Sequence, residues 1–486
     1  MKFGFSNSLE KRPQTDLMIL PFWEGAEAAA DFGHLKLEAV LRDFKGKNGE
    51  AILLYSEKGE RVLLLGLGKE KQATPETLRR AYASAIRMGQ GKKAKSLNVL
   101  FPKIKSLSKE EILTGVAEGI FLTNYAFTQL KHDSLKENPV VLLEQVNWIG
   151  LDAKEKGTLE KLKTIAQGVY FIRDLVNMNA DDKTPKRFAE IILSLQKDNP
   201  KLKMRVLDKK GIEEEKMGLI LAVNRASSHD PCLILMSYHG DPKSKEQIVL
   251  VGKGITYDTG GLRLKTPENM MTMKSDMAGA ATVMSAVHTA AALGLKVNVT
   301  AVAPVTENCI GPKSYKLGDV YRSHSGKTIE VNDTDAEGRL VLADAISYAI
   351  AHLKPTCLID LATLTGSIIF GLGEEIAGFF TNDEKLSKDF LGASEKTGEL
   401  IWRMPIHADY KEALKSDIAD FLNSGGREGG SIKAALFLQE FVGSVSWAHL
   451  DMAGPPFVAK PKHYNTTKAT GYGLRLLIDF LERRSK

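Results

Sequence analysis

The feature that most constrains the fold is the alternation of short apolar runs with helical patterns through the second half of the chain. Five runs have the length and composition of buried strands: PCLILMSYHG, QIVLVGKG, KVNVTAVAPV, TCLIDLATL and WAHLDMAG. Strands that are apolar on both faces are typical of parallel sheets that helices cover on both sides. The sequence therefore predicts an α/β fold with a mostly parallel sheet in this part of the chain.

The first third of the chain indicates a separate, smaller α/β unit. AILLYS from Ala51 and RVLLLGLG from Arg61 are predicted strands joined by a turn at Gly59. Ser108–Glu111 has the pattern of a capping box at the start of a helix, and VVLLEQ from Val140 is a further predicted strand. This mixture of strands and helices predicts an independent amino-terminal domain.

The domain boundaries follow from the helical period that separates these two parts. A length of 486 residues suits two or three domains, because a domain typically has about 150 residues. We expect residues 1–155 to form the amino-terminal domain and residues 181–486 the larger one. Residues 156–180 keep a helical period and predict a connecting helix.

Composition excludes several classes of protein. Hydrophobic residues make up 43% of the chain and charged residues 26%, which favours a globular protein over a disordered or fibrous one. The 66 Lys and Arg nearly balance the 60 Asp and Glu, so the net charge of +6 does not by itself indicate nucleic-acid binding. Three cysteines without metal-site spacing favour a reducing compartment, and no long apolar run is present. We therefore predict a cytoplasmic protein without a membrane partner.

Common catalytic and phosphate-binding motifs are absent or incomplete. The sequence has no HExxH helix and no GxSxG nucleophile elbow. Ser325–Thr328 is similar to the end of a phosphate-binding loop, but Tyr321 stands where that loop needs glycine, so a hairpin turn is the better interpretation. Gly252 and Gly254 follow a strand, yet Tyr257 replaces the third glycine of a dinucleotide fingerprint.

Ionisable residues gather where three predicted strands or loops meet helices, which is where parallel sheets place ligand sites. Lys253 and Asp258 follow the strand IVLV, and Asp276 precedes a helix of small residues. By itself, Asp276 has the position of a helix cap. Asp335 and Glu337 are two residues apart before another helix, so an extended backbone would point both carboxylates to one side.

Crowded carboxylates need a compensating cation, because otherwise one of them protonates. A salt bridge to Arg339 is one solution. Four carboxylates exceed what one arginine can neutralise, whereas two divalent ions about 3.5 to 4 Å apart would match them. Oxygen ligands of this kind suit Mn²⁺, Mg²⁺ or Zn²⁺.

These segments resemble the signature of the leucyl aminopeptidase family, the cytosol aminopeptidases. The family hallmark NTDAEGRL stands here as DTDAEGRL from Asp333 to Leu340. The resemblance extends from about Arg173 to Gly473 and includes GKGITYDTGG, DMAGAA, DLATLTGS and NSGGREGGSIKAALFL. It implies a macro-like amino-terminal domain, a catalytic domain and a homo-hexamer.

The resemblance also implies a set of metal ligands. Asp258 and Glu337 would bridge two divalent ions, either Mn²⁺ or Zn²⁺ with Mg²⁺ as a third choice. Asp335 would complete one metal site, and Lys253 and Asp276 would complete the other. Lys253 would bind as a neutral amine, because neighbouring dications lower its pKa.

Two further residues would act directly in catalysis. Lys265 resembles the family lysine that stays charged and polarises the scissile carbonyl, and Arg339 resembles the residue that holds a bicarbonate ion. The implied reaction is hydrolysis of the amino-terminal residue from short peptides by a metal-bridging water. Leu-like and Met-like residues would be preferred in a pocket whose positions align with four residues: Met273, Thr363, Gly366 and Ala453.

Departures and alternatives accompany this interpretation. Asp333 replaces the asparagine of the hallmark and adds a negative charge near the metal ligands, and Pro455 and Pro456 change the expected pocket rim. DNA binding, known for some bacterial relatives, is a secondary alternative that no helix-turn-helix pattern supports. A phosphate site at Gly66–Lys69 in the amino-terminal domain is a third, and a plain turn is the simpler interpretation of that segment.

Overall fold

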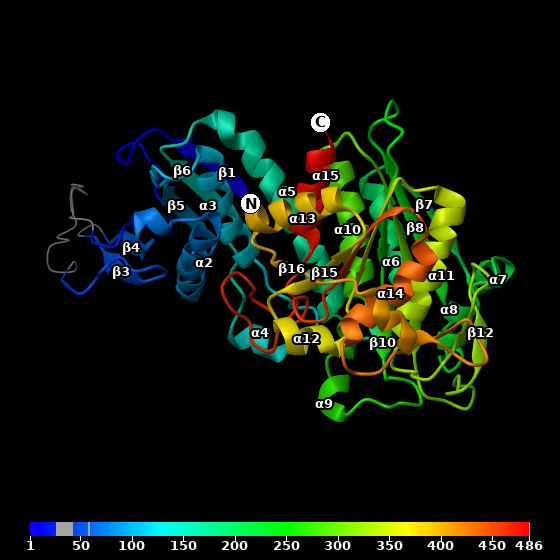
Figure 1. The fold of residues 1–486 in the computed structure, drawn as a ribbon. Helices are drawn as coiled ribbons and strands as arrows, with labels where there is room; N and C mark the ends of the chain where they lie inside the picture. Colours follow the sequence, from blue (N-terminus) through cyan, green and yellow to red (C-terminus); the bar gives the residue numbers. More distant parts are fainter. Residues whose placement is uncertain (26–41, 57–58, 486) are drawn as a thin grey trace. The chain divides into compact units, whose positions relative to one another are not determined.

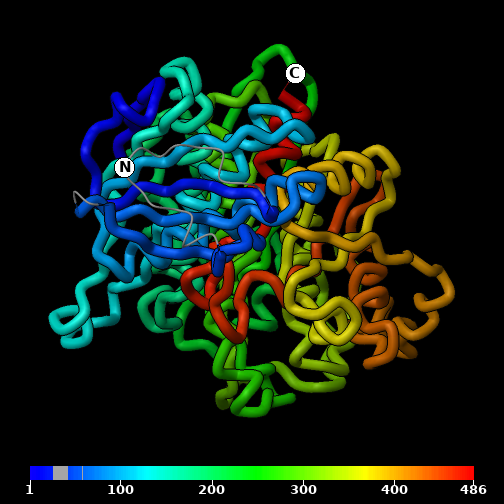
Figure 2. The backbone as a smooth tube through the Cα atoms, turned by 90° about the vertical axis from the view of Figure 1, so that its left-hand side faces the viewer, coloured from blue at the N-terminus to red at the C-terminus, as the bar shows by residue number. Residues whose placement is uncertain are grey.

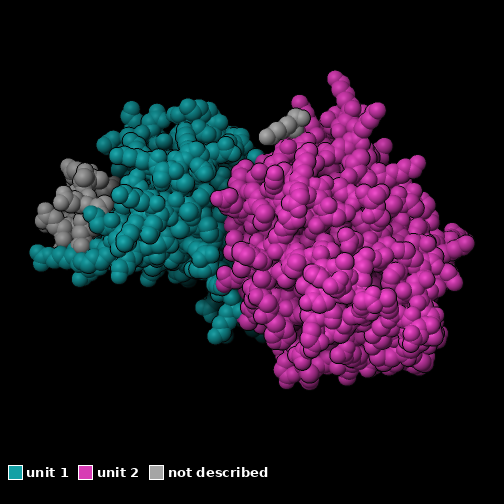
Figure 3. Space-filling view, viewed as in Figure 1, with its two compact units in different colours: residues 1–170, 460–467 teal, residues 171–459, 468–486 magenta. Residues whose placement is uncertain are grey.

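The computed structural model describes residues 1–25, 42–56 and 59–485. The chain forms two compact units, one from residues 1–170 and 460–467 and the other from residues 171–459 and 468–486 (Figure 3). The division falls within α5 (Lys156–Asn177), the helix that the sequence predicts as a connector.

The amino-terminal unit is built on a six-stranded sheet with the order β1-β6-β5-β2-β4-β3. Its strands run side by side in the blue and cyan part of the tube (Figure 2). They are β1 (Lys2–Ser6), β2 (Leu17–Phe22), β3 (Ala51–Tyr55), β4 (Arg61–Gly66), β5 (Ser96–Leu100) and β6 (Gln145–Ile149). Only β3 and β4 pair antiparallel among them, which confirms the predicted hairpin. The predicted turn itself includes residues 57–58, which lie outside the described residues.

Helices of this unit begin where the sequence places their caps. Ser108 and Glu111 form the predicted capping box at the start of α3 (Lys109–Thr123), and Thr74 forms a second one with Thr77. Among the described residues, this unit also contains α2 (Pro75–Gly91), the short α4 (Asp133–Glu137) and the first part of α5. Two orphan backbone donors are satisfied at each of these caps, which fixes where α2 and α3 start.

The predicted strand VVLLEQ is wrong, because the strand β6 starts five residues later at Gln145. Val140 and Leu142 are exposed, and only Leu143 of the apolar run is buried. Asn124 holds Leu143 from both sides, since its side chain accepts from the backbone N–H of Leu143 at 2.7 Å and donates to the carbonyl at 3.0 Å. The backbone of this segment is thus paired with a side chain rather than with a strand.

The Gly66–Lys69 segment has the plain turn that the sequence analysis favours. The backbone N–H groups of Gly66, Leu67 and Gly68 all donate to backbone carbonyls, at 2.7 to 2.9 Å. A phosphate cradle needs such N–H groups free to face the ligand. The segment therefore offers none of these three donors to a phosphate.

The larger unit contains a nine-stranded sheet with the order β16-β15-β18-β14-β9-β11-β8-β7, with β10 also paired to β11. The strands are β7 (Lys203–Leu207), β8 (Cys232–His239), β9 (Ile248–Gly252), β10 (Gly254–Asp258), β11 (Asn298–Asn308), β14 (Cys357–Ala362), β15 (Ala377–Thr381), β16 (Ile401–Arg403) and β18 (Ser446–Asp451). The central strands β18, β14, β9 and β11 are parallel, while β15, β8 and β7 join antiparallel neighbours. The predicted mostly parallel sheet is confirmed, as are its five predicted strands.

Helices cover both faces of this sheet (Figure 1). They are α6 (Pro185–Asp198), α7 (Lys209–Glu214), α8 (Gly218–Asn224), α9 (Pro267–Met270), α10 (Ala278–Leu293), α11 (Glu337–Leu353), α12 (Gly366–Leu372), α13 (Glu384–Thr397), α14 (Gly430–Val442) and α15 (Leu474–Arg484). A small third sheet contains β12 (Val320–Arg322), β13 (Thr328–Glu330) and β17 (Phe421–Leu422). The β12–β13 hairpin turns at Gly326 with φ of 88°, which confirms the predicted turn at Ser325–Thr328.

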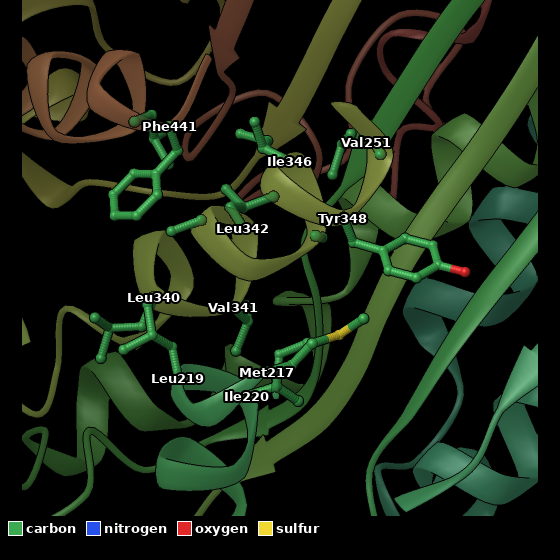
Figure 4. Close-up of a cluster of buried hydrophobic side chains, with 14 of the residues drawn as sticks. Met217, Leu219, Ile220, Val251, Leu340, Val341, Leu342, Ile346, Tyr348 and Phe441 are labelled. Carbon is green, nitrogen blue, oxygen red and sulfur yellow. The ribbon is translucent and has the colours of Figure 1, made fainter. Parts of the chain in front are cut away.

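The core of the larger unit holds α11 in place. Figure 4 shows Leu340 and Val341 of α11 beside Leu219 and Ile220 of α8, all fully buried. Burial of one such side chain contributes about 1.5 to 3 kcal/mol. The start of α11 is therefore fixed by packing rather than by its own capping, since its N-cap makes no side-chain hydrogen bond. In the described part of the chain, no helix has the length and apolarity to cross a membrane.

Candidate active site and metal centre

The candidate residues lie at the carboxyl ends of the parallel strands. Lys253 follows β9, Asp258 ends β10 and Thr363 follows β14. Asn308 ends β11, directly beside Asp258 in the sheet register. Loops at this edge carry side chains from several strands to one place, which is the usual ligand position in open α/β sheets.

Three carboxylates converge here. Asp258, Asp335 and Glu337 each offer an oxygen, and these oxygens lie within 4.8 Å of one another. Asp258 and Glu337 are each only 1% exposed. The predicted reason for their approach is wrong, because Asp335 lies in a turn and Glu337 already begins α11, so neither has an extended backbone. The turn and the first helical residue bring the two carboxylates together instead.

Lys253 joins two of the carboxylates. Its ammonium lies 2.8 Å from Asp276 and 2.8 Å from Glu337, and it donates to the carbonyl of Thr363 at 3.0 Å. A Cβ atom on Gly338 would lie 2.7 Å from the Lys253 nitrogen, so glycine is required there for the lysine to reach this position. The lysine side chain thus passes directly over the first turn of α11.

Asp276 is not the helix cap that its sequence position favours. The N-cap of α10 is Met277, and no side-chain hydrogen bond caps this helix. The Asp276 side chain instead accepts from the Thr363 hydroxyl at 2.6 Å and faces Lys253. This orientation directs its carboxylate into the cluster, so Asp276 belongs to the site.

Lys265 supplies the second positive charge. Its ammonium lies 2.8 Å from Asp258 and also forms an ion pair with Asp335. Two lysines therefore face four carboxylates: Asp258, Asp276, Asp335 and Glu337. The excess of negative charge predicted from the sequence remains after the second lysine is included.

The pKa values respond to this crowding. Burial, reinforced by Asp258, raises the pKa of Glu337 to about 8, and burial raises the pKa of Asp276 to about 6. Burial opposes the charged form of Lys253, but Asp276, Glu337 and Asp258 outweigh it and raise its pKa. The same competition raises the pKa of Lys265. The protein alone thus lacks enough cations for this set of acids.

The hydrogen bonding and the donor atoms of the site are compatible with divalent metal ions. The second oxygen of Glu337 is buried and has no hydrogen-bond partner within the described residues. A buried carboxylate oxygen without a partner is costly unless a cation reaches it. Carboxylate oxygens together with one amine form a donor set that suits Mn²⁺, Mg²⁺ and Zn²⁺. The residues present therefore fit divalent ions.

Arg339 does not form the salt bridge that was the alternative to metal binding. Within the described residues it makes no ion pair with Asp335 or Glu337, and its Nη1 donates to the carbonyl of Asn423 at 2.9 Å. Its Nε is buried and has no hydrogen-bond partner in the same part of the chain. The guanidinium is thus held in position with a donor to spare, which suits the binding of an anion.

Several positioning residues have no signal in the sequence. Asn308 donates to Asp258 at 2.8 Å and to the carbonyl of Thr334 at 3.0 Å. Thr334 donates to the carbonyl of Gly260 at 2.7 Å, and the Asn423 side chain accepts from the backbone of Asn332 at 2.9 Å. Each of these bonds spans at least 26 positions, so only the folded chain reveals them.

The extra charge at Asp333 has a partner. Its carboxylate forms an ion pair with Arg263 and accepts from the backbone N–H of Asp335 at 2.9 Å. Arg263 lies on the loop that carries Lys265. The added negative charge is therefore directed toward an arginine instead of standing alone beside the metal ligands.

The four expected pocket residues are all accessible to some degree. Met273, Thr363 and Ala453 are half-buried and Gly366 is exposed. A Cβ atom on Gly366 would meet nothing within 4 Å. None of the four is a core residue, although the residue types alone would favour the core.

Comparisons with known proteins agree with this geometry. Residues 170–478 match the cytosol aminopeptidase family, catalytic domain, and residues 23–134 match the N-terminal domain of the same family. The chain belongs to the cytosol aminopeptidase family. As a cytosol aminopeptidase it is a metal-dependent hydrolase that acts on peptides from the amino terminus.

Relatives of similar length support the assignment. A probable cytosol aminopeptidase from Protochlamydia amoebophila is 46% identical over 495 residues, which span 100% of this chain and 99% of the relative. A probable cytosol aminopeptidase from Chlamydia felis is 44% identical and spans 97% of both chains. The match thus includes both units of the protein.

Solved structures share the fold of this cytosol aminopeptidase. A tomato leucine aminopeptidase mutant has a TM-score of 0.88 and 31% identity, covering 99% of this chain and 96% of that chain. The bottromycin maturation enzyme BotP in complex with Mn has a TM-score of 0.86 and 32% identity, covering 97% of this chain and 100% of that chain. The two-domain α/β architecture expected from the sequence is therefore confirmed.

Proposed function

We propose that the protein is a dinuclear-metal aminopeptidase that removes Leu-like and Met-like residues from the amino terminus of short peptides. The observation that carries the proposal is the convergence of Asp258, Asp335 and Glu337 within 4.8 Å, beside Lys253 and Asp276. So many acids around two lysines leave negative charge for two dications to balance. Mn²⁺ or Zn²⁺ is the proposed metal, with Mg²⁺ as a third choice.

Each ligand has a position that suits its proposed role. Asp258 and Glu337 are the buried carboxylates that would be shared by the two ions, and Asp335, which faces Lys265 together with Asp258, would complete one of the two metal sites. Lys253 and Asp276 would complete the other site, and Lys253 would give up its proton because only a neutral amine binds metal. When bound, the two ions supply an acidified water and a polarised carbonyl.

Lys265 and Arg339 are the proposed catalytic residues. Lys265 is charged and only 13% exposed, so its ammonium can stabilise negative charge on the substrate oxygen without competition from much water. Arg339 keeps a buried Nε without a partner in the described residues and would hold bicarbonate there. Bicarbonate in that place would act as a general base.

The substrate follows from the geometry around the ligands. A free α-amino group is a suitable metal ligand, which restricts the reaction to the first residue of a peptide. Met273, Thr363, Gly366 and Ala453 would line an apolar pocket for that residue, and their partial exposure supports this role. We further propose a cytoplasmic homo-hexamer that admits short peptides and excludes folded proteins.

The test is the release of leucine from leucinamide after Mn²⁺ loading and again after exhaustive chelation. We expect release only with metal, and a loss in Glu337→Gln larger than the 10- to 100-fold that removal of an outer-shell partner typically costs. Glutamine keeps the volume of this buried side chain, so folding is preserved.

Glu395→Ala is the matched control, because Glu395 is an exposed acid on α13 outside the site. The control should keep full activity. Full activity in the chelated wild type would contradict a metal mechanism. Retained activity in Glu337→Gln with normal metal content would contradict the proposed ligand set.

A further inference from the structure

A second cluster of metal-ligand residues lies outside the candidate active site. Glu215 follows α7, His324 lies in the β12–β13 hairpin and His352 lies in the last turn of α11. Each offers one ligand atom, and the three atoms lie within 4.8 Å of one another. Sequence spacing could not reveal this group, because its members are 28 to 137 positions apart.

The distances within the cluster suit a small divalent ion. The Nε2 atom of His352 lies 3.0 Å from Oε2 of Glu215, and Nε2 of His324 lies 3.9 Å from the same oxygen. Two ligands about 2.0 to 2.1 Å from a tetrahedral zinc ion are about 3.4 Å apart. The observed separations bracket this value, so only small side-chain movements are needed.

Ordinary hydrogen bonding does not account for His324. A separation of 3.9 Å is too long for a hydrogen bond to Glu215, and the Nδ1 atom is buried without a partner within the described residues. The imidazole is only 12% exposed, so few water molecules can reach its nitrogen atoms in place of a protein partner.

The surroundings hold both imidazoles in place. Tyr348 stacks on His352 with ring centroids 4.3 Å apart and contacts His324 edge-on at 5.8 Å. The backbone N–H of His324 donates to Asp344 at 2.8 Å. Side chains of His352 and Glu215 remain 42% and 26% exposed, so water can reach a fourth coordination position.

We propose that Glu215, His324 and His352 form a binding site for one divalent transition metal ion, best matched by Zn²⁺. Two histidines and one carboxylate are a common zinc set when water supplies the fourth ligand. The site is distinct from the candidate active site, because His352 lies 15 residues after Glu337 on α11, about 22 Å along a helix. A bound ion would cross-link the end of α7, the β12–β13 hairpin and the last turn of α11.

The test counts zinc in the full-length protein. Wild type and the double variant His324→Ala/His352→Ala are dialysed to equilibrium against the same free Zn²⁺ concentration, and metal per chain is measured by mass spectrometry. We expect the wild type to hold one Zn²⁺ more than the double variant. Any zinc at the candidate active site cancels in this difference.

His407→Ala is the matched control, because His407 is 62% exposed and faces one carboxylate at 3.9 Å without a second histidine. It should keep the wild-type zinc content. Equal zinc in the double variant and the wild type would overturn the proposal.

A second variant protects the test against misfolding. His352→Gln changes only the more exposed imidazole and should also lose one Zn²⁺, with an unchanged circular dichroism spectrum. Co²⁺ substitution gives an independent readout, since a tetrahedral site with nitrogen ligands shows visible absorption bands. These bands should weaken in His352→Gln and persist in His407→Ala, and bands of equal strength in both would contradict the proposal.

Discussion

The two ends of α11 gather ionisable side chains in different ways. At its first turn, Glu337 and Arg339 are 1% and 7% exposed, and Lys253 lies over Gly338. At its last turn, His352 is 42% exposed and shares one carboxylate with His324. The first end contains carboxylates and a lysine that must compensate one another inside the protein, whereas the second contains two imidazoles beside one partly exposed carboxylate.

Burial and residue type together explain why the two ends of α11 differ. Buried carboxylates must be matched by lysine or metal, because an unpaired buried charge costs several kcal/mol. The two imidazoles at the last turn face one carboxylate that is 26% exposed, so water compensates part of its charge and an ion is not required there. We therefore expect substitutions at the first turn to affect chemistry and those further along to affect stability or metal content.

The strongest test of this contrast removes a charge at the first end. In Lys265→Met an unbranched apolar side chain one atom shorter remains, but the cation beside Asp258 and Asp335 is lost. We expect kcat for leucinamide to fall about 10²- to 10³-fold with little change in KM, as for the loss of one oxyanion donor. Steady-state kinetics of the Mn²⁺-loaded protein measures this effect.

Lys388→Met is the control, since Lys388 is exposed on α13. A rise in KM without a fall in kcat would show that Lys265 binds the ground state and the transition state equally well. That result would remove it from the catalytic residues.

A smaller effect is expected in the middle of α11, where Asp344 is completely buried. Its carboxylate accepts from the backbone N–H groups of Leu219, Ile220 and His324, yet burial outweighs these donors and raises its pKa to about 7. The unfolded pKa is about 4. Between these values the folded chain holds a proton that the unfolded chain releases, so this group makes the free energy of unfolding fall as pH rises from about 4 to 7.

Asp344→Asn has the same size and cannot titrate, so it should lack this contribution. Denaturant unfolding at a series of pH values gives the difference between the two proteins. We expect the wild type to lose stability relative to the variant across this window. Parallel curves would mean that Asp344 has the same pKa in both states.

The smallest effect is expected at the departure from the family hallmark. Asp333→Asn restores the hallmark residue and removes an ion pair with Arg263, which is 64% exposed. Exposed ion pairs contribute about 0 to 1 kcal/mol, and asparagine can still accept from the N–H of Asp335. Activity and the midpoint of thermal unfolding should change little. A large gain in Mn²⁺ affinity would show instead that Asp333 acts on the metal site directly.

The same physical distinction explains which sequence predictions hold. Apolar strand runs and helix caps depend on residues close in the chain, and the strands of the central sheet and the Ser108 cap are where the patterns place them. The strand predicted from Val140 is wrong because the side chain of Asn124, distant in the sequence, binds the backbone of Leu143. The prediction of Asp276 as a helix cap is wrong for a similar reason. Lys253 and Thr363, which are distant in the chain, bind its carboxylate within the site.

The α/β class, the parallel central strands and the family could be predicted from the sequence alone, because they depend on local patterns and an ordered set of motifs. The candidate carboxylates and lysines could be predicted in the same way. How these side chains meet depends on the folded chain. Asn308, Thr334 and Asn423 fix the loops through contacts between distant segments, and Glu215 approaches His324 and His352 only in the folded chain. Such contacts depend on how strands and helices pack, so they cannot be predicted from the residues that are neighbours in the chain.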